Sequence, residues 1–120
     1  MRADSYSLIT AIDAFVLTNA AASRRQPPIQ NACYGASKAS LNWYGVRINA
    51  EDDWLNAFVF NPGFSTTDMG VAAARAYGFT EDALLTPGEA LDGMFRVLQT
   101  TTKEEHGGKL VRYTGEVDDW

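Results

Sequence analysis

The sequence contains only one cysteine, Cys33, and one histidine, His106. A single thiol cannot form an internal disulfide, and a structural zinc site needs about four Cys or His ligands. The composition therefore excludes a disulfide-stabilised scaffold and a zinc cluster. A chain without disulfides suits a reducing compartment, so we expect a cytoplasmic protein.

Basic residues are also few, with ten Lys and Arg against fifteen Asp and Glu, a net charge of -5. Nucleic acids and anionic membranes attract clusters of basic side chains, and the chain has one adjacent basic pair, Arg24–Arg25. No apolar run approaches the ~20 residues that cross a bilayer. The first residues resemble neither a signal peptide nor a transit peptide. We expect no nucleic-acid partner and no membrane insertion.

What the sequence does contain is an alternation of strand and helix patterns. The hydrophobic fraction is 46% of 120 residues, which is enough for one domain, and we leave segment 1–13 unassigned. The short apolar run 14–18 predicts a buried strand, and 55–60 predicts a second, ended by the turn residues 61–63. A last strand is expected at 109–113, after Gly107-Gly108.

Two helices are expected between these strands. Apolar residues recur at helical spacing from a cap at Asn31 to about Asp52. Thr86-Pro87-Gly88-Glu89 is a capping box with proline at the first helical position, which predicts the start of a second helix. Residues 64–85 are expected to form an irregular loop with one helical turn around 71–75.

This order predicts an α/β fold of about three strands and two main helices, with parallel pairing and right-handed crossovers. Three strands are few for such a sheet, whose strands are normally covered on both faces. The first strand would also present an open edge. The pattern therefore indicates part of a larger domain, with residues 1–120 forming one partial unit.

Tyr34 and Lys38 are the main candidates for chemistry. Residues four apart share one helix face, so the two side chains can meet. An ammonium neighbour favours the phenolate and lowers the phenol pKa from its usual value near 10. Such a tyrosine can exchange a proton with a carbonyl or alcohol oxygen while hydride moves at carbon. The alternative for this spacing alone is an ordinary surface contact.

Two segments resemble the short-chain dehydrogenase/reductase family. YGASKASLNWYGVRI resembles its active-site helix, and NPGFSTTDM, residues 61–69, resembles its Pro-Gly-x-x-x-Thr loop. The resemblance implies the C-terminal part of a Rossmann-type doubly wound parallel sheet, with the N-terminal nucleotide-binding half missing. It also implies an NAD(P)-dependent oxidoreductase that interconverts a carbonyl and an alcohol, and a homo-oligomer.

The same resemblance assigns residue roles. Tyr34 would be the acid–base group, and Lys38 would lower its pKa and bind the ribose of the cofactor. Pro62, Gly63 and Ser65 would line the nicotinamide. Thr67 would form a hydrogen bond with the carboxamide or the pyrophosphate.

The segments PPIQNACYGASKASLN and NPGFSTTDMG and the ending GGKLVRYTGEVDDW most resemble the fungal norsolorinic acid ketoreductase-like subgroup. This resemblance implies NADP as the cofactor, a role in fungal secondary metabolism, and an aromatic polyketide as one candidate substrate. Phe64, Tyr77 and Phe79 lie in the segment that matches the family's substrate loop.

The sequence departs from the family pattern at two places. It has no Gly-x-x-x-Gly-x-Gly turn, which would receive the pyrophosphate at a helix N-terminus. The position of the family's catalytic serine falls at Asn19, which could donate an amide hydrogen bond, or at Ala20, which could not. Loss of one polarising donor commonly costs on the order of 10²–10³ in rate.

Three hypotheses remain open. The first is a truncated short-chain oxidoreductase. The second is a non-catalytic remnant, or an association partner of a full-length relative. The third is a sugar-nucleotide epimerase or dehydratase, which also uses Tyr-x-x-x-Lys. The short region after the last strand argues against this third hypothesis, because it leaves little room for a larger substrate domain.

Overall fold

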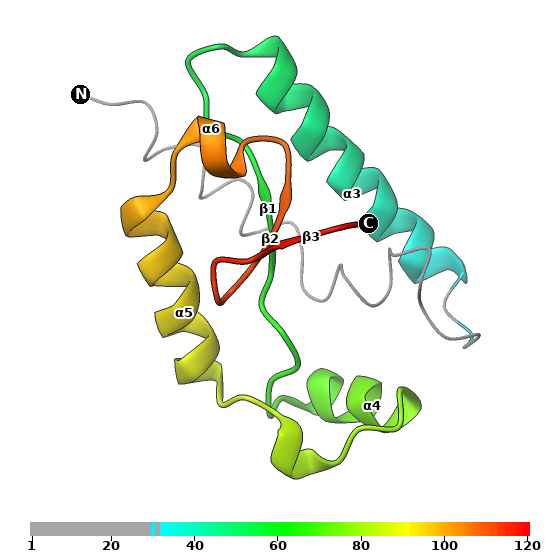
Figure 1. Ribbon diagram of the computed structural model, residues 1–120. Helices are drawn as coiled ribbons and strands as arrows, with labels where there is room; N and C mark the ends of the chain where they lie inside the picture. The colour runs from blue at the N-terminus through cyan, green and yellow to red at the C-terminus, as the bar shows by residue number, and fades with distance from the viewer. Residues whose placement is uncertain (1–29, 31) are drawn as a thin grey trace.

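The computed structural model describes residue 30 and residues 32–120. The expected strand at 14–18, Asn19 and the cap at Asn31 lie outside these residues. The described strands are short and lie between helices (Figure 1). The elements in chain order are α3 (Ala32–Glu51), β1 (Val59–Asn61), α4 (Asp68–Ala76), the 3-10 turn η2 (Glu81–Ala83), α5 (Pro87–Thr100), α6 (Lys103–His106), β2 (Leu110–Arg112) and β3 (Val117–Asp118).

The described strands form one sheet in the order β1-β2-β3. β1 and β2 pair in parallel, with Val59 opposite Leu110, which confirms the parallel pairing expected for these two strands. β3 then pairs antiparallel with β2, with Val111 opposite Val117. The sheet is therefore mixed, because β3, a strand that the sequence did not predict, is added in the antiparallel sense. A two-residue strand is too short to show an alternating pattern, so no periodic signal marks β3 in the sequence.

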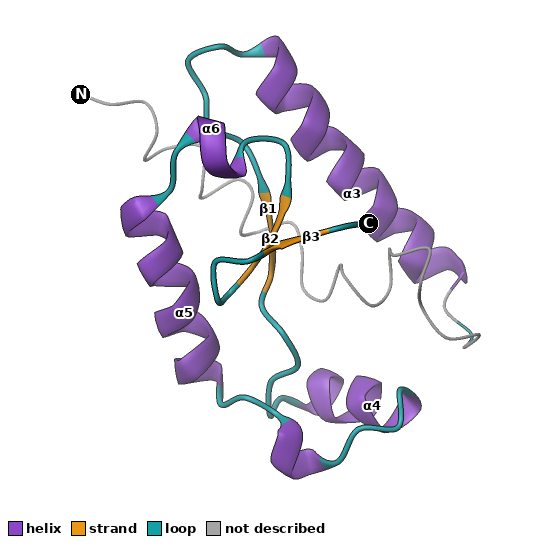
Figure 2. Cartoon of the chain, in the orientation of Figure 1, coloured by secondary structure: helices purple, strands orange, loops and turns teal. Residues whose placement is uncertain are grey.

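The two long helices cover opposite faces of the sheet, as Figure 2 shows. Successive strand residues point to opposite faces. Gly45 of α3 lies so close to Val59 that an added Cβ would be 3.3 Å from the valine Cγ1. Phe58 and Phe60, on the other face of β1, are fully buried and cluster with Val97 of α5.

The boundaries of the long helices agree with the sequence. α3 begins and ends within one residue of the expected limits, 31 and 52. The capping box of α5 is confirmed. Thr86 Oγ1 accepts a hydrogen bond from the Glu89 amide at 3.2 Å, and Glu89 Oε2 accepts one from the Thr86 amide at 2.7 Å. None of the described helices is both long and apolar enough to cross a membrane.

Helix α4 is longer than the single turn expected around 71–75, since it extends over nine residues, Asp68–Ala76. Thr67 caps its N-terminus, because the threonine Oγ1 accepts a hydrogen bond from the Gly70 amide at 3.1 Å. Asp68 in the first turn complements the helix dipole. Thr67 as a capping residue and Asp68 in the first turn are sequence features that indicate the start of a helix at this position.

The C-terminal end of α3 is held by a side chain from α6. Lys103 Nζ donates hydrogen bonds to the carbonyl oxygens of Asn49, Asp52 and Leu55, at 2.6, 2.9 and 2.6 Å. The last carbonyl groups of a helix have no partner within it, so a cation here both satisfies them and complements the dipole. Lys103 thereby fixes the direction of α3 relative to the segment that enters β1.

Candidate active site at the start of α3 and the end of β1

Tyr34 and Lys38 lie in the first turns of α3, and the structure brings their side chains together. Lys38 Nζ is 5.3 Å from the centre of the Tyr34 ring, within the range of a cation–π contact. Tyr34 is 37% exposed, so its side chain is partly shielded and remains accessible to solvent. This is the contact that the spacing of four residues predicted.

The pKa of Tyr34 differs from the sequence-based expectation. Partial burial raises the pKa of the Tyr34 hydroxyl above its usual value near 10, and the neighbouring Tyr77 raises it further. Burial disfavours the charged phenolate, and a second phenolate nearby repels it. The ammonium of Lys38, which lies over the ring, does not offset these effects. Tyr34 is therefore a protonated phenol at neutral pH.

An aromatic cluster reaches this tyrosine from the segment around α4. Tyr77 lies directly after α4, and its ionised hydroxyl would repel a Tyr34 phenolate, which raises the pKa of Tyr34. The Phe64 ring centre is 5.8 Å from that of Tyr77 and 5.5 Å from that of Phe79. These are ordinary separations for packed aromatic side chains. The sequence placed all three residues in one segment but could not show that Tyr77 approaches Tyr34.

The turn that follows β1 requires glycine at its second position. Asn61 Oδ1 accepts a hydrogen bond from the Gly63 amide at 3.0 Å, which closes the turn. Gly63 has φ +75°, a conformation that other residues rarely adopt. An added Cβ would lie 3.0 Å from Leu85 Cδ1 and 3.1 Å from Tyr113 Cε1. Pro62 and Gly63 are both half-buried in this turn.

Ser65 and Thr67 lie further along the same loop. A parallel β-bridge joins Ser65 to Leu85 and holds the loop against the segment that leads into α5. Thr67 Oγ1 accepts the capping hydrogen bond from Gly70, which leaves its hydroxyl proton able to donate to another group. An added Cβ on Gly70 would lie 1.9 Å from the Ser65 carbonyl oxygen, so this part of the loop is tightly packed.

The start of α3 and this loop lie at the same end of the sheet (Figure 1), because α3 runs antiparallel to β1. In open α/β sheets, ligands bind outside the carboxyl ends of parallel strands. Tyr34, Lys38, Pro62, Gly63, Ser65 and Thr67 all belong to this end. No group of three or more His, Cys, Asp or Glu residues that could hold a metal occurs in the part of the chain that the structure describes.

No protein-family model matches the chain. Curated relatives do match in sequence. The short-chain dehydrogenase RED3 of Pyricularia oryzae is 34% identical over 88 residues, which are 72% of this chain and 35% of the relative. The norsolorinic acid ketoreductase of Aspergillus parasiticus is 35% identical over 81 residues, 68% of this chain and 30% of the relative. The chain thus spans about a third of the length of these relatives.

Solved structures match the fold. The NADPH-bound carbonyl reductase from chicken fatty liver superposes with a TM-score of 0.71 at 22% identity, over 88% of this chain and 41% of that chain. The carbonyl reductase Sniffer of D. melanogaster gives a TM-score of 0.69 at 17% identity, over 88% and 40%. The predicted α/β architecture is confirmed, and it corresponds to the C-terminal part of these folds.

Proposed function

We propose a function for this chain, which belongs to the short-chain dehydrogenase/reductase family. It carries the acid–base pair and the nicotinamide side of an NAD(P)-dependent oxidoreductase. The reaction interconverts a carbonyl and an alcohol. The observation that carries this proposal is the contact between Tyr34 and Lys38, at the end of the sheet where the Pro62–Thr67 loop follows β1. Relatives named as dehydrogenases and ketoreductases support it.

Tyr34 is the proton donor in this mechanism. Its raised pKa keeps the hydroxyl protonated at neutral pH, which suits reduction of a carbonyl. As hydride reaches the carbonyl carbon, the C=O π pair moves to oxygen, and the Tyr34 O–H bond breaks to give that oxygen its proton. The Lys38 ammonium stabilises the phenolate that is left. Proton transfer of this kind contributes about 10²–10⁴ in rate.

The loop residues fit the nicotinamide end of the cofactor. The Thr67 hydroxyl proton is available to a carboxamide oxygen, and Pro62, Gly63 and Ser65 form a compact loop beside it. When bound, NADPH or NADH supplies the hydride. We favour NADP because the superposed carbonyl reductase binds NADPH. Asn19, at the position of the family's serine, would polarise the carbonyl by an amide hydrogen bond. It lies outside the described residues.

The substrate in this proposal is a small aromatic ketone. Phe64, Tyr77 and Phe79 form an aromatic cluster near Tyr34, and flat rings pack well against such side chains. Three relatives are named norsolorinic acid ketoreductases, which suggests an aromatic polyketide and a role in fungal secondary metabolism. A cytoplasmic location remains part of the same proposal.

A second function is favoured by one specific observation. The sequence has no Gly-x-x-x-Gly-x-Gly turn, so it offers no motif for the pyrophosphate. Trp43 and Tyr44 on α3 are 55% and 61% exposed, as expected for residues that a second subunit covers. In this alternative, the chain is a non-catalytic remnant or associates with a full-length relative or a second copy.

Two measurements test the proposed function. The chain is titrated with NADPH by fluorescence, and reduction of an aromatic ketone is followed by loss of NADPH absorbance. We expect Tyr34→Phe to lower the rate by on the order of 10²-fold or more while NADPH affinity changes little. Tyr44→Phe, on the same helix but exposed, is the matched control and keeps the rate. An unchanged rate in Tyr34→Phe contradicts the mechanism. Absence of NADPH binding at millimolar concentration favours the second function.

A further inference from the structure

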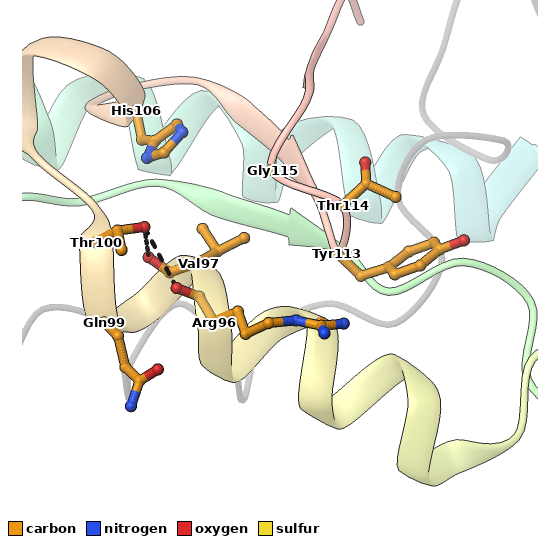
Figure 3. A pocket seen from close by; sticks show the side chains of 9 residues that line it. Arg96, Val97, Gln99, Thr100, His106, Tyr113, Thr114 and Gly115 are labelled. Carbon is orange, nitrogen blue, oxygen red and sulfur yellow. Dashed lines mark hydrogen bonds between the residues drawn. The ribbon is translucent and has the colours of Figure 1, made fainter.

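A pocket of about 680 Å³ lies between α5, α6 and the turn that joins β2 to β3 (Figure 3). One of its lining residues, Tyr113, also packs against Gly63 of the loop after β1, whereas Tyr34 and Lys38 do not line it. Its wall includes Val97 of α5, which packs with Phe58 and Phe60 on one face of β1. Val59 points to the opposite face, which α3 covers. The pocket and the Tyr34–Lys38 pair therefore belong to opposite faces of the sheet.

Arg96 lines this pocket and differs from the other arginines that the structure describes. Arg47, Arg75 and Arg112 each form an ion pair with a carboxylate. The Arg96 guanidinium forms no hydrogen bond or ion pair with any described residue, although the Arg96 carbonyl accepts a hydrogen bond from Thr100 Oγ1 at 3.3 Å. Figure 3 shows its side chain extending from α5 toward the Tyr113 side of the pocket. A guanidinium group has five N–H donors in a planar fork, and here that fork has no acceptor within the described chain.

His106 supplies a second donor to the same pocket. Asn56 Nδ2 donates a hydrogen bond to Thr101 Oγ1 at 3.2 Å, and Thr101 Oγ1 lies 2.8 Å from His106 Nδ1. Because an amide NH₂ can only donate, the threonine hydroxyl accepts from Asn56 and can give its own proton to His106 Nδ1. In the tautomer that accepts this proton at Nδ1, the ring N–H is on Nε2. The Arg96 guanidinium and this N–H are then both donors, and the Gln99 amide also lines the pocket.

The rest of the pocket is mainly apolar. Val97 and the backbone carbons of Gly93 and Gly115 contribute to the wall, together with Tyr113. At the rim, Thr114 Oγ1 donates to the Glu116 carboxylate at 3.2 Å. A carboxylate at the rim repels a dianion such as phosphate more strongly than it repels a monoanion.

We propose that this pocket binds a small monocarboxylate with a flat apolar body, such as an aromatic acid. The Arg96 fork donates hydrogen bonds to the two carboxylate oxygens in the bidentate geometry that guanidinium groups favour. The His106 N–H gives a further donor, and the apolar wall covers the ring. A volume of about 680 Å³ lies within the usual range for small-molecule sites. This proposal does not depend on the oxidoreductase function, since neither Tyr34 nor Lys38 lines this pocket.

The test is an NMR titration of the ¹⁵N-labelled full chain with benzoate. We expect saturable shifts of the Gly93, Gly115 and His106 signals. Arg96→Gln should weaken binding by on the order of ten-fold or more, as loss of a charged hydrogen bond predicts. Arg75→Gln is the matched control, because Arg75 is also exposed but pairs with Glu81 far from the pocket. Benzamide, a neutral molecule of the same shape, should bind at least ten-fold more weakly than benzoate.

Three outcomes would overturn the proposal. Equal benzoate affinity in Arg96→Gln and the unmodified chain would exclude recognition by the guanidinium. Equal affinity for benzamide would show that the carboxylate is not recognised. Self-association that depends on Arg96, without saturable benzoate shifts, would assign the pocket to an acidic segment of a second copy. Arg96→Lys keeps the charge without the fork and should give intermediate affinity. Tyr34→Phe should leave benzoate binding unchanged.

Discussion

Tyr34 illustrates how one side chain depends on its surroundings in a way that the sequence does not show. The spacing to Lys38 predicted the contact between the two residues, and the structure confirms that contact. The same spacing led us to expect a lowered pKa, whereas burial and Tyr77 raise it. Burial depends on what packs over α3, and the approach of Tyr77 depends on the path of the chain after α4. Neither the burial of Tyr34 nor the approach of Tyr77 can be deduced from the spacing of Tyr34 and Lys38.

This raised pKa leads to a prediction for stability at high pH. Because the folded-state pKa of Tyr34 exceeds the unfolded value near 10, its stabilising contribution is fully present below about pH 10 and is lost as pH rises through the folded pKa. The free energy of unfolding of the unmodified chain should therefore fall more steeply above about pH 10 than that of Tyr34→Phe. Urea unfolding at several pH values measures this, with Tyr44→Phe as control. Parallel curves for Tyr34→Phe and the unmodified chain would contradict it.

Among the elements, those with strong local signals were predicted well. The capping box set the start of α5, and apolar spacing set the limits of α3 to within a residue. β3 and the full length of α4 were missed. β3 is short and depends on pairing with β2, so its stability is tertiary rather than local. The loop residues 62, 63, 65 and 67 follow β1 as the motif predicted, but their roles toward a cofactor remain predictions.

The position of α3 depends on one ammonium group from a distant part of the chain. Lys103 is partly buried, and its three hydrogen bonds go to carbonyls at and beyond the end of α3. Lys103→Met would leave these carbonyls without their partner while keeping most of the side-chain volume. We expect a loss of about 2 kcal/mol in the free energy of unfolding, since hydrogen bonds to charged groups are worth about 1.5–3 kcal/mol.

Lys109→Met is the matched control for this change. Lys109 is exposed, and the structure gives its Nζ one hydrogen bond, to the Glu105 carbonyl at 2.6 Å. Its substitution should change the free energy of unfolding by less than about 0.5 kcal/mol. Urea unfolding of both variants compares the two lysines directly. Equal losses would show that the Lys103 contacts do not stabilise the end of α3.

At the scale of the whole molecule, helix α5 presents two large apolar side chains to solvent, Leu91 and Phe95. They lie one turn apart on α5 and are 60% and 61% exposed, next to the helix face that packs on the sheet. A surface of this kind fits a chain that corresponds to about a third of its relatives' length.

Binding of the dye ANS, which fluoresces on exposed apolar surface, should report this feature. We expect the double substitution Leu91→Gln and Phe95→Gln to lower ANS fluorescence about two-fold, because adjacent exposed apolar side chains form a patch. Val117→Gln removes one exposed apolar side chain, 50% accessible, from a different element and should have little effect. An equal decrease in both variants would place the dye elsewhere.

The short strand β3 has a consequence for how the sheet can grow. It occupies the outer edge of β2, and Arg112 of β2 forms an ion pair with Asp118 of β3 at 2.7 Å. Charged, very short edge strands discourage addition of a further strand. Among the described strands, addition of a further strand is therefore favoured at the β1 side. The β2–β3 hairpin thus acts as a terminus, which gives strand addition to the described sheet a preferred direction.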